Sequence, residues 1–364
     1  MPVHCLAAPS RCACQTLLAM LCLGLTSPLF ANDTPDVLSQ SAVLSPQAEH
    51  AVLLGVTRAE DRLVAVGERG VILLSDDNGN SWRQIQAPVS STLTAVQFVD
   101  GQQGWAVGHA GVVLHSADGG ESWKLQLDGN RAAQIEIKTA RADQTNPQRL
   151  QAAELLVADG ADKPFLALHF SDPQHGMVAG AYGLALRTED GGQNWQSMMG
   201  AIPNGWGAHI YAISRRGPEL YLAGEQGFAA RSLDGGLSFE RLEPSYEGSF
   251  FAQGLLPGGE LVLAGLRGTV LLSRDRGDSF EQLHNPIPVS INSALASEGG
   301  LLLANQAGGL LRVTADGKVV PQSTAGSPVA DLVNAPNGQL VGVGFSGTVS
   351  LAPRNLATTQ ALAE

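Results

Sequence analysis

Cysteine is confined to the first 22 residues of this 364-residue chain, and aromatic residues make up only 5% of it. Without that segment the protein has no disulfide, no cysteine-ligated metal and no thiol nucleophile. No apolar run reaches the roughly 20 residues of a membrane-spanning helix. The net charge of −12 excludes a typical nucleic-acid binder, which needs a basic face. Hydrophobic residues at 44% and 43 glycines instead predict a large core connected by many tight turns.

The first 31 residues have the features of a secretory signal peptide. Arg11 provides a positive charge, residues 16–25 are an apolar stretch of h-region length, and Ala31 is a small residue suited to cleavage. The stretch is too short for a membrane anchor. We expect cleavage after Ala31 and export, with a periplasmic location for the cysteine-free chain. Residues 32–354 then form one domain, and residues 355–364 a C-terminal tail.

A repeated unit dominates the rest of the chain. It consists of an apolar strand, Gly-x-x-Gly, a second apolar strand and the box Ser/Thr-x-Asp-x-Gly-x-x-Trp/Phe. Five copies are intact, a sixth is degraded and a seventh keeps only Gly344 and Gly347. The box aspartates are Asp77, Asp118, Asp190, Asp234 and Asp275. These residues suit hydrogen bonding to turn amides, so we expect them to be structural.

The period of the repeat, about 41 residues, predicts the fold class. Units of this length with glycine and aromatic punctuation are typical of four-stranded propeller blades. We therefore predict an all-β, seven-bladed β-propeller with Asp-box repeats. The last copy ends after three strands, so residues 37–44 are expected to supply its outer strand in a 3+1 closure.

One step between repeats is longer by about 30 residues, which indicates a helical insertion over residues 131–163 between blades 2 and 3. Asn146 suits a helix N-cap, Pro147 the first turn and Gly160 the end. The helix could cover the ring as a lid. Basic residues outnumber acidic ones between Arg131 and Arg149, which suggests either a contact surface or a solvated loop.

The residues that break the repeat are the candidate partner-binding residues. The Gly-x-x-Gly turns and the connections between blades should open on one face of a propeller. The candidates are Arg69, His109, Tyr182, Arg267 and Phe345 in the turns, and Trp206, Tyr246 and Phe250 in the connections. Aromatic and arginine side chains are frequent interface anchors. The histidines show no metal-ligand spacing, so neither a metal nor another cofactor is expected.

The unit running from Gly104 to Trp123 resembles the repeats of the photosystem II stability/assembly factor family. Arg69 and Arg267 match that family's Gly-x-Arg-Gly turn. The resemblance implies a seven-bladed, non-enzymatic assembly factor that binds an envelope or inner-membrane protein through one face. It also implies, for relatives outside photosynthetic organisms, a partner of the resistance-nodulation-division transporter type. We expect a monomer that binds no nucleic acid.

Two other classes of function remain as alternatives. Asp-boxes also occur in sialidases, so a glycosidase is one alternative, and a propeller that binds a small ligand is the other. A glycosidase needs two facing carboxylates, for which Glu68 and Glu225 are candidates. No motif supports that pair, and only four tyrosines are present to supply a sialidase nucleophile. We therefore predict that the chain is not an enzyme.

Overall fold

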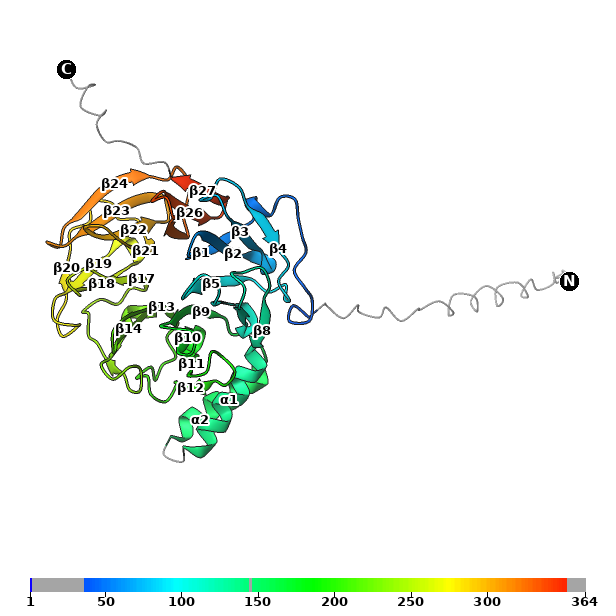
Figure 1. Cartoon of the computed structure of the whole chain (residues 1–364). Helices are drawn as coiled ribbons and strands as arrows, with labels where there is room; N and C mark the ends of the chain where they lie inside the picture. Colours follow the sequence, from blue (N-terminus) through cyan, green and yellow to red (C-terminus); the bar gives the residue numbers. More distant parts are fainter. Residues whose placement is uncertain (2–35, 144–145, 352–364) are drawn as a thin grey trace, which may run out of the picture. The chain divides into compact units, whose positions relative to one another are not determined.

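The computed structural model describes Met1 and residues 36–143 and 146–351. Apart from Met1, the expected signal peptide (1–31) and the C-terminal tail (355–364) lie outside the described residues. Seven antiparallel sheets stand around a common centre, with the first strand of each blade innermost (Figure 1). The prediction of a seven-bladed β-propeller is therefore confirmed.

The first four blades each contain four strands. Blade 1 consists of β1 (Leu53–Ala59), β2 (Arg62–Gly67), β3 (Ile72–Ser75) and β4 (Arg83–Ile85). Blade 2 consists of β5 (Leu93–Phe98), β6 (Gly104–Gly108), β7 (Val113–Ser116) and β8 (Lys124–Leu127). Blade 3 consists of β9 (Phe165–Phe170), β10 (Gly176–Gly180), β11 (Ala185–Thr188) and β12 (Gln196–Ser197). Blade 4 consists of β13 (Ile210–Arg216), β14 (Glu219–Gly224), β15 (Ala229–Ser232) and β16 (Glu240–Arg241).

The remaining blades differ in strand number. Blade 5 consists of β17 (Phe250–Leu255), β18 (Leu261–Gly265), β19 (Val270–Ser273) and β20 (Glu281–Gln282). Blade 6 consists of β21 (Ile291–Ser297), β22 (Gly300–Asn305), β23 (Gly309–Thr314) and β24 (Val319–Thr324). Blade 7 has three strands among the described residues, β25 (Asp331–Asn334), β26 (Leu340–Gly344) and β27 (Gly347–Leu351).

The expected 3+1 closure is wrong for the described residues. The segment 36–47, called the strap below, lies against blade 1 instead of pairing with β27. Ala42 donates its main-chain N–H to the carbonyl of Ala87, and Ser90 donates to the carbonyl of Val37. The physical reason is Ala42, which is 1% exposed and packs in the apolar core between blades 1 and 2. A short 3₁₀ turn, η1 (Ala48–His50), then leads into β1.

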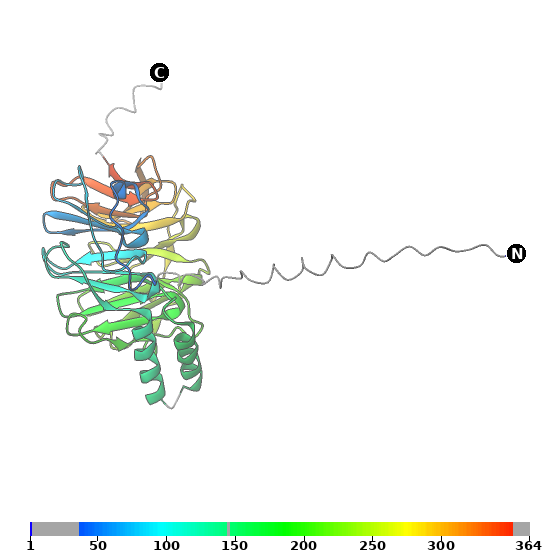
Figure 2. The same cartoon turned by 90° about the vertical axis from the view of Figure 1, so that its right-hand side faces the viewer.

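The insertion contains two helices where one was expected. Helix α1 covers Gly129–Ala142, with Asp128 as its N-cap, and α2 covers Pro147–Asp159. The predicted signals of α2 are confirmed, since Asn146 caps it, Pro147 begins it and Gly160 ends it. The hairpin projects from the rim of the ring beside β12 and does not cover its centre (Figures 1 and 2). It is therefore not a lid.

Candidate functional site: the turn face of the propeller

One face of the ring carries the turns between second and third strands together with the connections between blades. We call it the turn face, and the opposite face, which carries the Asp-boxes, the box face. Five of these turns are short 3₁₀ elements: η2 (Glu68–Gly70), η3 (His109–Gly111), η4 (Ala181–Gly183), η5 (Glu225–Gly227) and η6 (Leu266–Gly268). Each contacts the first strand of the next blade, so the turns form one continuous rim.

Close backbone approach explains the glycines that flank each turn. A Cβ atom on Gly67 would lie 2.1 Å from the carbonyl oxygen of Val52. Gly70 adopts a φ of +74° and passes equally close to the carbonyl of Val89. Between these glycines stands a non-glycine residue whose φ is also positive. In chain order these middle residues are Arg69, Ala110, Tyr182, Gln226 and Arg267.

The left-handed backbone conformation is strained for residues that carry a Cβ atom, and such strain clusters at functional sites. In four of the five turns the positive-φ residue is exposed, whereas Ala110 in η3 is buried. Arg69, Tyr182 and Arg267 are among the exposed residues. The N–H of Arg69 lies 3.4 Å from Thr92 Oγ1, and the N–H of Arg267 lies 3.1 Å from Ser290 Oγ. These contacts fix both arginine turns against the following blade in the same way.

Aromatic and cationic side chains gather on the turn face over blades 3 and 4. Tyr182 stacks beneath Lys163 Nζ, 4.8 Å from the ring centroid, and packs against His209 at 5.0 Å. Trp206 is 56% exposed and covers the guanidinium of Arg241, whose Cζ lies 4.3 Å from its ring centroid. These five residues are called the aromatic cluster below. Lys163 lies in the connection before blade 3, and Tyr182 lies in the turn η4. Trp206 and His209 lie in the connection between blades 3 and 4, and Arg241 lies in β16, the last strand of blade 4.

Arg241 has an unusual environment in this cluster. Its guanidinium is held between the rings of Trp206 and Phe228, and burial lowers its pKa despite the nearby carboxylate of Glu243. Its Nη1 atom is buried with no hydrogen-bond partner among the described residues. A cation in this state favours an additional acceptor or an anionic partner, because an unpaired buried donor is costly.

Two aromatic residues that are not among the candidates above extend the cluster toward the centre. Tyr211 packs against Phe251 of the next blade, with ring centroids 5.3 Å apart. Both occupy a β-bulge, where the pairing register shifts between β13 and β14 and between β17 and β18. A bulge re-aims one side chain. Such a shift leaves no local signal in the sequence, so strand alternation alone could not identify these residues.

The prediction for Phe250 is wrong. This side chain is 0% exposed and belongs to the core shared by blades 4 and 5, because the bulge turns Phe251 outward in its place. Tyr246 is half-buried, packs against the Phe250 ring at 5.3 Å and donates its hydroxyl hydrogen to the carbonyl of Leu266. It therefore supports the turn η6.

The other candidates lie on other blades of the turn face. Arg69 belongs to blade 1, His109 to blade 2, Arg267 to blade 5 and Phe345 to blade 7. His109 and Phe345 are exposed, and the carbonyl of His109 accepts the Ser91 hydroxyl. The structure thus brings together Tyr182 and Trp206 and distributes the remaining candidates around the rim.

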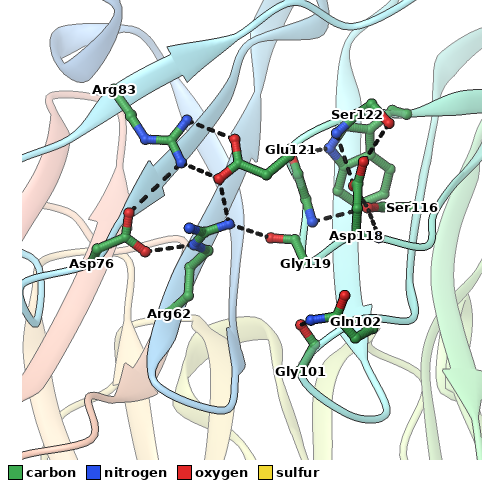
Figure 3. A network of polar contacts seen from close by, with 12 residues as sticks. Arg62, Asp76, Arg83, Gly101, Gln102, Ser116, Asp118, Gly119, Glu121 and Ser122 are labelled. Atoms are coloured by element: carbon green, nitrogen blue, oxygen red, sulfur yellow. Dashed lines mark hydrogen bonds and ion pairs between the residues drawn. The ribbon is translucent and has the colours of Figure 1, made fainter.

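The five box aspartates have the same surroundings. Asp77 accepts the hydroxyl hydrogens of Ser75 and Ser81 and the main-chain N–H of Ser81. These donors lower the pKa of Asp77 to about 2, and Ser279 and Ser273 do the same for Asp275. Each box carboxylate is therefore ionised and occupied by its own turn. Figure 3 shows this arrangement at Asp118, between Ser116 and Ser122.

Charges on the box face join blades 1 and 2. Arg62 contacts Asp76 at 2.5 Å and Glu121 at 2.8 Å, and Arg83 contacts the same two carboxylates (Figure 3). Hydrogen bonds from Arg62 and Arg83 lower the pKa values of Asp76 and Glu121 respectively. The arginine Nη1 of Arg62 also donates to the carbonyl of Gly119. The network connects neighbouring blades and leaves neither carboxyl as a proton donor.

The basic excess of the insertion is partly neutralised inside it. Arg149 donates to both carboxylate oxygens of Glu136, at 2.8 and 3.0 Å. Glu136 is 1% exposed and also accepts the hydroxyl hydrogen of Ser197 in β12. This ion pair joins α1, α2 and blade 3, so Arg149 is a residue that positions the hairpin on the rim.

Within the described ranges, no group of three or more histidine, cysteine, aspartate or glutamate side chains is arranged to hold a metal ion. The same part of the chain has no helix with the length and hydropathy needed to cross a bilayer.

Comparison with known proteins places the chain in a family. A family model described as photosynthesis system II assembly factor YCF48 matches residues 42–145 and 148–248. The photosystem II assembly lipoprotein Ycf48 of Synechococcus sp. (strain CC9902) is 32% identical over 77 residues. That match covers 21% of this chain and only 23% of the cyanobacterial protein.

Solved structures support the same fold. YCF48 bound to a D1 peptide superimposes with a TM-score of 0.61 and 18% identity, covering 85% of this chain and 95% of that one. YCF48 from Cyanidioschyzon merolae gives a TM-score of 0.61 and 14% identity, covering 84% and 97%. The family model spans more than half of the residues, and the chain therefore belongs to the photosynthesis system II assembly factor YCF48 family.

Proposed function

We propose that this protein is a non-enzymatic assembly factor of the cell envelope that holds an exposed segment of a membrane protein on its turn face. The aromatic cluster carries the proposal. Exposed Trp and Tyr rings beside cations are typical anchors of protein interfaces. A seven-bladed ring does not need exposed Trp206 or Tyr182 for its packing. A solved relative binds a D1 peptide, which supports a membrane-protein partner for this chain as well.

The location and the kind of partner are further parts of the proposal. The apolar segment 16–25 and Ala31 support export with cleavage after Ala31, and hence a periplasmic location. Mass spectrometry of the protein from a periplasmic extract tests this, and an intact Met1 on cytoplasmic protein would contradict it. The resemblance of the repeats supports a transporter of the resistance-nodulation-division type as the partner.

Local geometry argues against the glycosidase alternative. Glu68 accepts the main-chain N–H of Val52, and Glu225 accepts that of His209. Both glutamates therefore perform the same structural task, which is to hold the residue before the first strand of their blades. They lie in blades 1 and 4 and do not form the facing pair that a glycosidase needs. The ionised box aspartates lack the raised pKa of a general acid.

Site-specific photo-crosslinking in the native host tests the proposal. The photoreactive residue p-benzoylphenylalanine replaces Trp206 in one strain and Gln102, an exposed residue of the box face, in another. We expect a discrete adduct with a membrane protein from position 206 and none from position 102. Deletion of the gene should lower the amount of that same membrane protein. Equal adducts from both faces, or no membrane-protein adduct, would contradict the proposal.

A further inference from the structure

A cavity of about 650 Å³ lies on the turn face beside blade 1. The strap forms one wall and the turn η2 forms another. Val37, Val43, Ala51 and Val71 give it an apolar lining, and Arg69 stands at its edge. The segment that fails to close blade 7 therefore builds a hollow next to one of the two arginine turns.

The strap presents apolar side chains to solvent around this cavity. Val43 is 80% exposed, and Val37 and Leu44 are also exposed although both are large and hydrophobic. Val37 and Val43 belong to the cavity lining, so the exposed surface and the cavity are continuous. Contiguous apolar surface of this kind marks an interaction site more often than scattered single residues do.

The lining of the cavity contains one cation, Arg69, and one anion, Glu68. The guanidinium of Arg69 has no hydrogen-bond or ion-pair partner in the part of the chain that the structure describes, while its main-chain N–H is held by Thr92. The neighbouring carboxylate of Glu68 already accepts the N–H of Val52 at 2.9 Å. The two charged side chains therefore differ: the guanidinium of Arg69 is open to a ligand, whereas one carboxylate oxygen of Glu68 is already held by the N–H of Val52.

We propose that this cavity binds an extended segment of the partner protein in which apolar side chains are followed directly by an acidic one. The apolar side chains fill the space lined by Val43 and Val71, and the carboxylate pairs with Arg69. The planar guanidinium suits a carboxylate, which it can bind through two parallel hydrogen bonds. This inference rests on the proposed function and assigns a second contact on the same face, away from the aromatic cluster.

Peptide binding to the purified full-length protein tests the inference. The probe is a fluorescein-labelled octapeptide, amidated at its C-terminus, with two leucines followed by aspartate in a glycine-serine background. A second probe carries asparagine in place of aspartate. We expect the aspartate probe to bind roughly tenfold or more tightly than the asparagine probe, as a lost charged hydrogen bond implies. Binding is followed by fluorescence anisotropy.

Three variants locate the contact. Arg69→Gln should weaken binding of the aspartate probe by roughly the same tenfold factor but leave binding of the asparagine probe unchanged. The reason is that the substitution in the protein and the substitution in the probe remove the same interaction. Val43→Asp should weaken the binding of both probes. Arg267→Gln is the matched control, since Arg267 has the same positive-φ turn position but does not border this cavity. Thermal melting verifies that all three variants are folded.

Two results would overturn the inference. One is equal affinity for the aspartate and asparagine probes, and the other is equal loss from Arg69→Gln and Arg267→Gln. Displacement of the bound probe by vesicles of anionic phospholipid, with no dependence on the aspartate, would assign the cavity to a lipid surface and also overturn it. If the probes fail while crosslinking from position 206 persists, this inference falls and the proposed function stands.

Discussion

The carboxylate of Asp331 accepts a hydrogen bond at 3.0 Å from the main-chain N–H of Val56, 275 residues earlier in the sequence. Its other oxygen accepts the hydroxyl hydrogen of Ser293 at 2.8 Å. Asp331 begins the first strand of blade 7, and the two donors belong to the first strands of blades 1 and 6. A half-buried side chain, rather than a shared strand, thus joins the last blade to both of its neighbours.

Replacing Asp331 by alanine should destabilise the ring at this junction. The N–H of Val56 and the hydroxyl of Ser293 would lose their acceptor, at a cost of about 1–3 kcal/mol. Urea unfolding followed by tryptophan fluorescence measures the change. Ser293→Ala, which removes one donor and leaves the carboxylate bound to Val56, should cost less. Equal stability of Asp331→Ala and the wild-type protein would show that the junction does not depend on this residue.

Two tryptophans separate stability from binding. Trp123 is buried, donates its indole N–H to Gly120 and meets Phe98 edge-on. Trp123→Ala should therefore cost about 3–5 kcal/mol of unfolding free energy. Trp206→Ala, on the exposed ring, should cost less than about 1 kcal/mol yet abolish the membrane-protein contact. Thermal melting and co-purification from crosslinked cells test the pair. The reverse pattern would contradict the assignment of both residues.

The two arginine turns should contribute charge to partner capture. Arg69→Glu combined with Arg267→Glu reverses both exposed charges without touching the core. We expect loss of co-purification of the membrane partner with a melting temperature close to that of the wild-type protein. Arg58→Glu combined with Arg274→Glu is a control of equal charge change outside these turns. Unchanged capture by the Arg69 and Arg267 variant, or equal loss in the control, would refute a specific role for these turns.

His169 should make stability depend on pH. Burial, together with the charge of Arg215, lowers the pKa of His169 to about 4. In the unfolded chain this pKa is about 6.5, so between pH 6.5 and 4 the unfolded state binds more protons. The free energy of unfolding should therefore fall as the pH decreases through this window, by up to about 3 kcal/mol.

His169→Gln should reduce this slope in urea titrations performed at several pH values from 7 to 4. The exposed His50, replaced by glutamine, is the control and should retain the slope of the wild-type protein. An unchanged slope in His169→Gln would show that other groups cause the loss of stability in acid.

Features encoded by short-range patterns could be predicted from the sequence. The box residues have fixed spacing because each aspartate bonds within its own turn, as Asp77 does with Ser81. The signals of α2 are equally local, since Asn146 caps the N–H of Arg149. Helix α1 was not predicted, because Gly129 and Asn130 are weak helix formers at its start; the structure shows that Asp128 caps it.

Features that depend on contacts between distant segments could not be predicted. The apolar pattern of residues 37–44 predicted an outer strand of blade 7, but the structure places Ala42 of this segment in the core between blades 1 and 2. The bulge that buries Phe250 and leaves Phe251 partly exposed likewise depends on pairing with β18. Arg241 beneath Trp206 was missed for the same reason, since the two residues meet only after blades 3 and 4 have packed.

The positive-φ residue of each turn has a consequence for how this protein family can diversify. Arginine, alanine, tyrosine and glutamine all occupy this position with nearly the same backbone conformation, from φ +49° to +57°. The flanking glycines, not the middle side chain, maintain the close approach to the next blade. Mutation at this position can therefore change which chemical group the rim displays without altering strand register, so that new binding preferences can evolve one blade at a time on an unchanged scaffold.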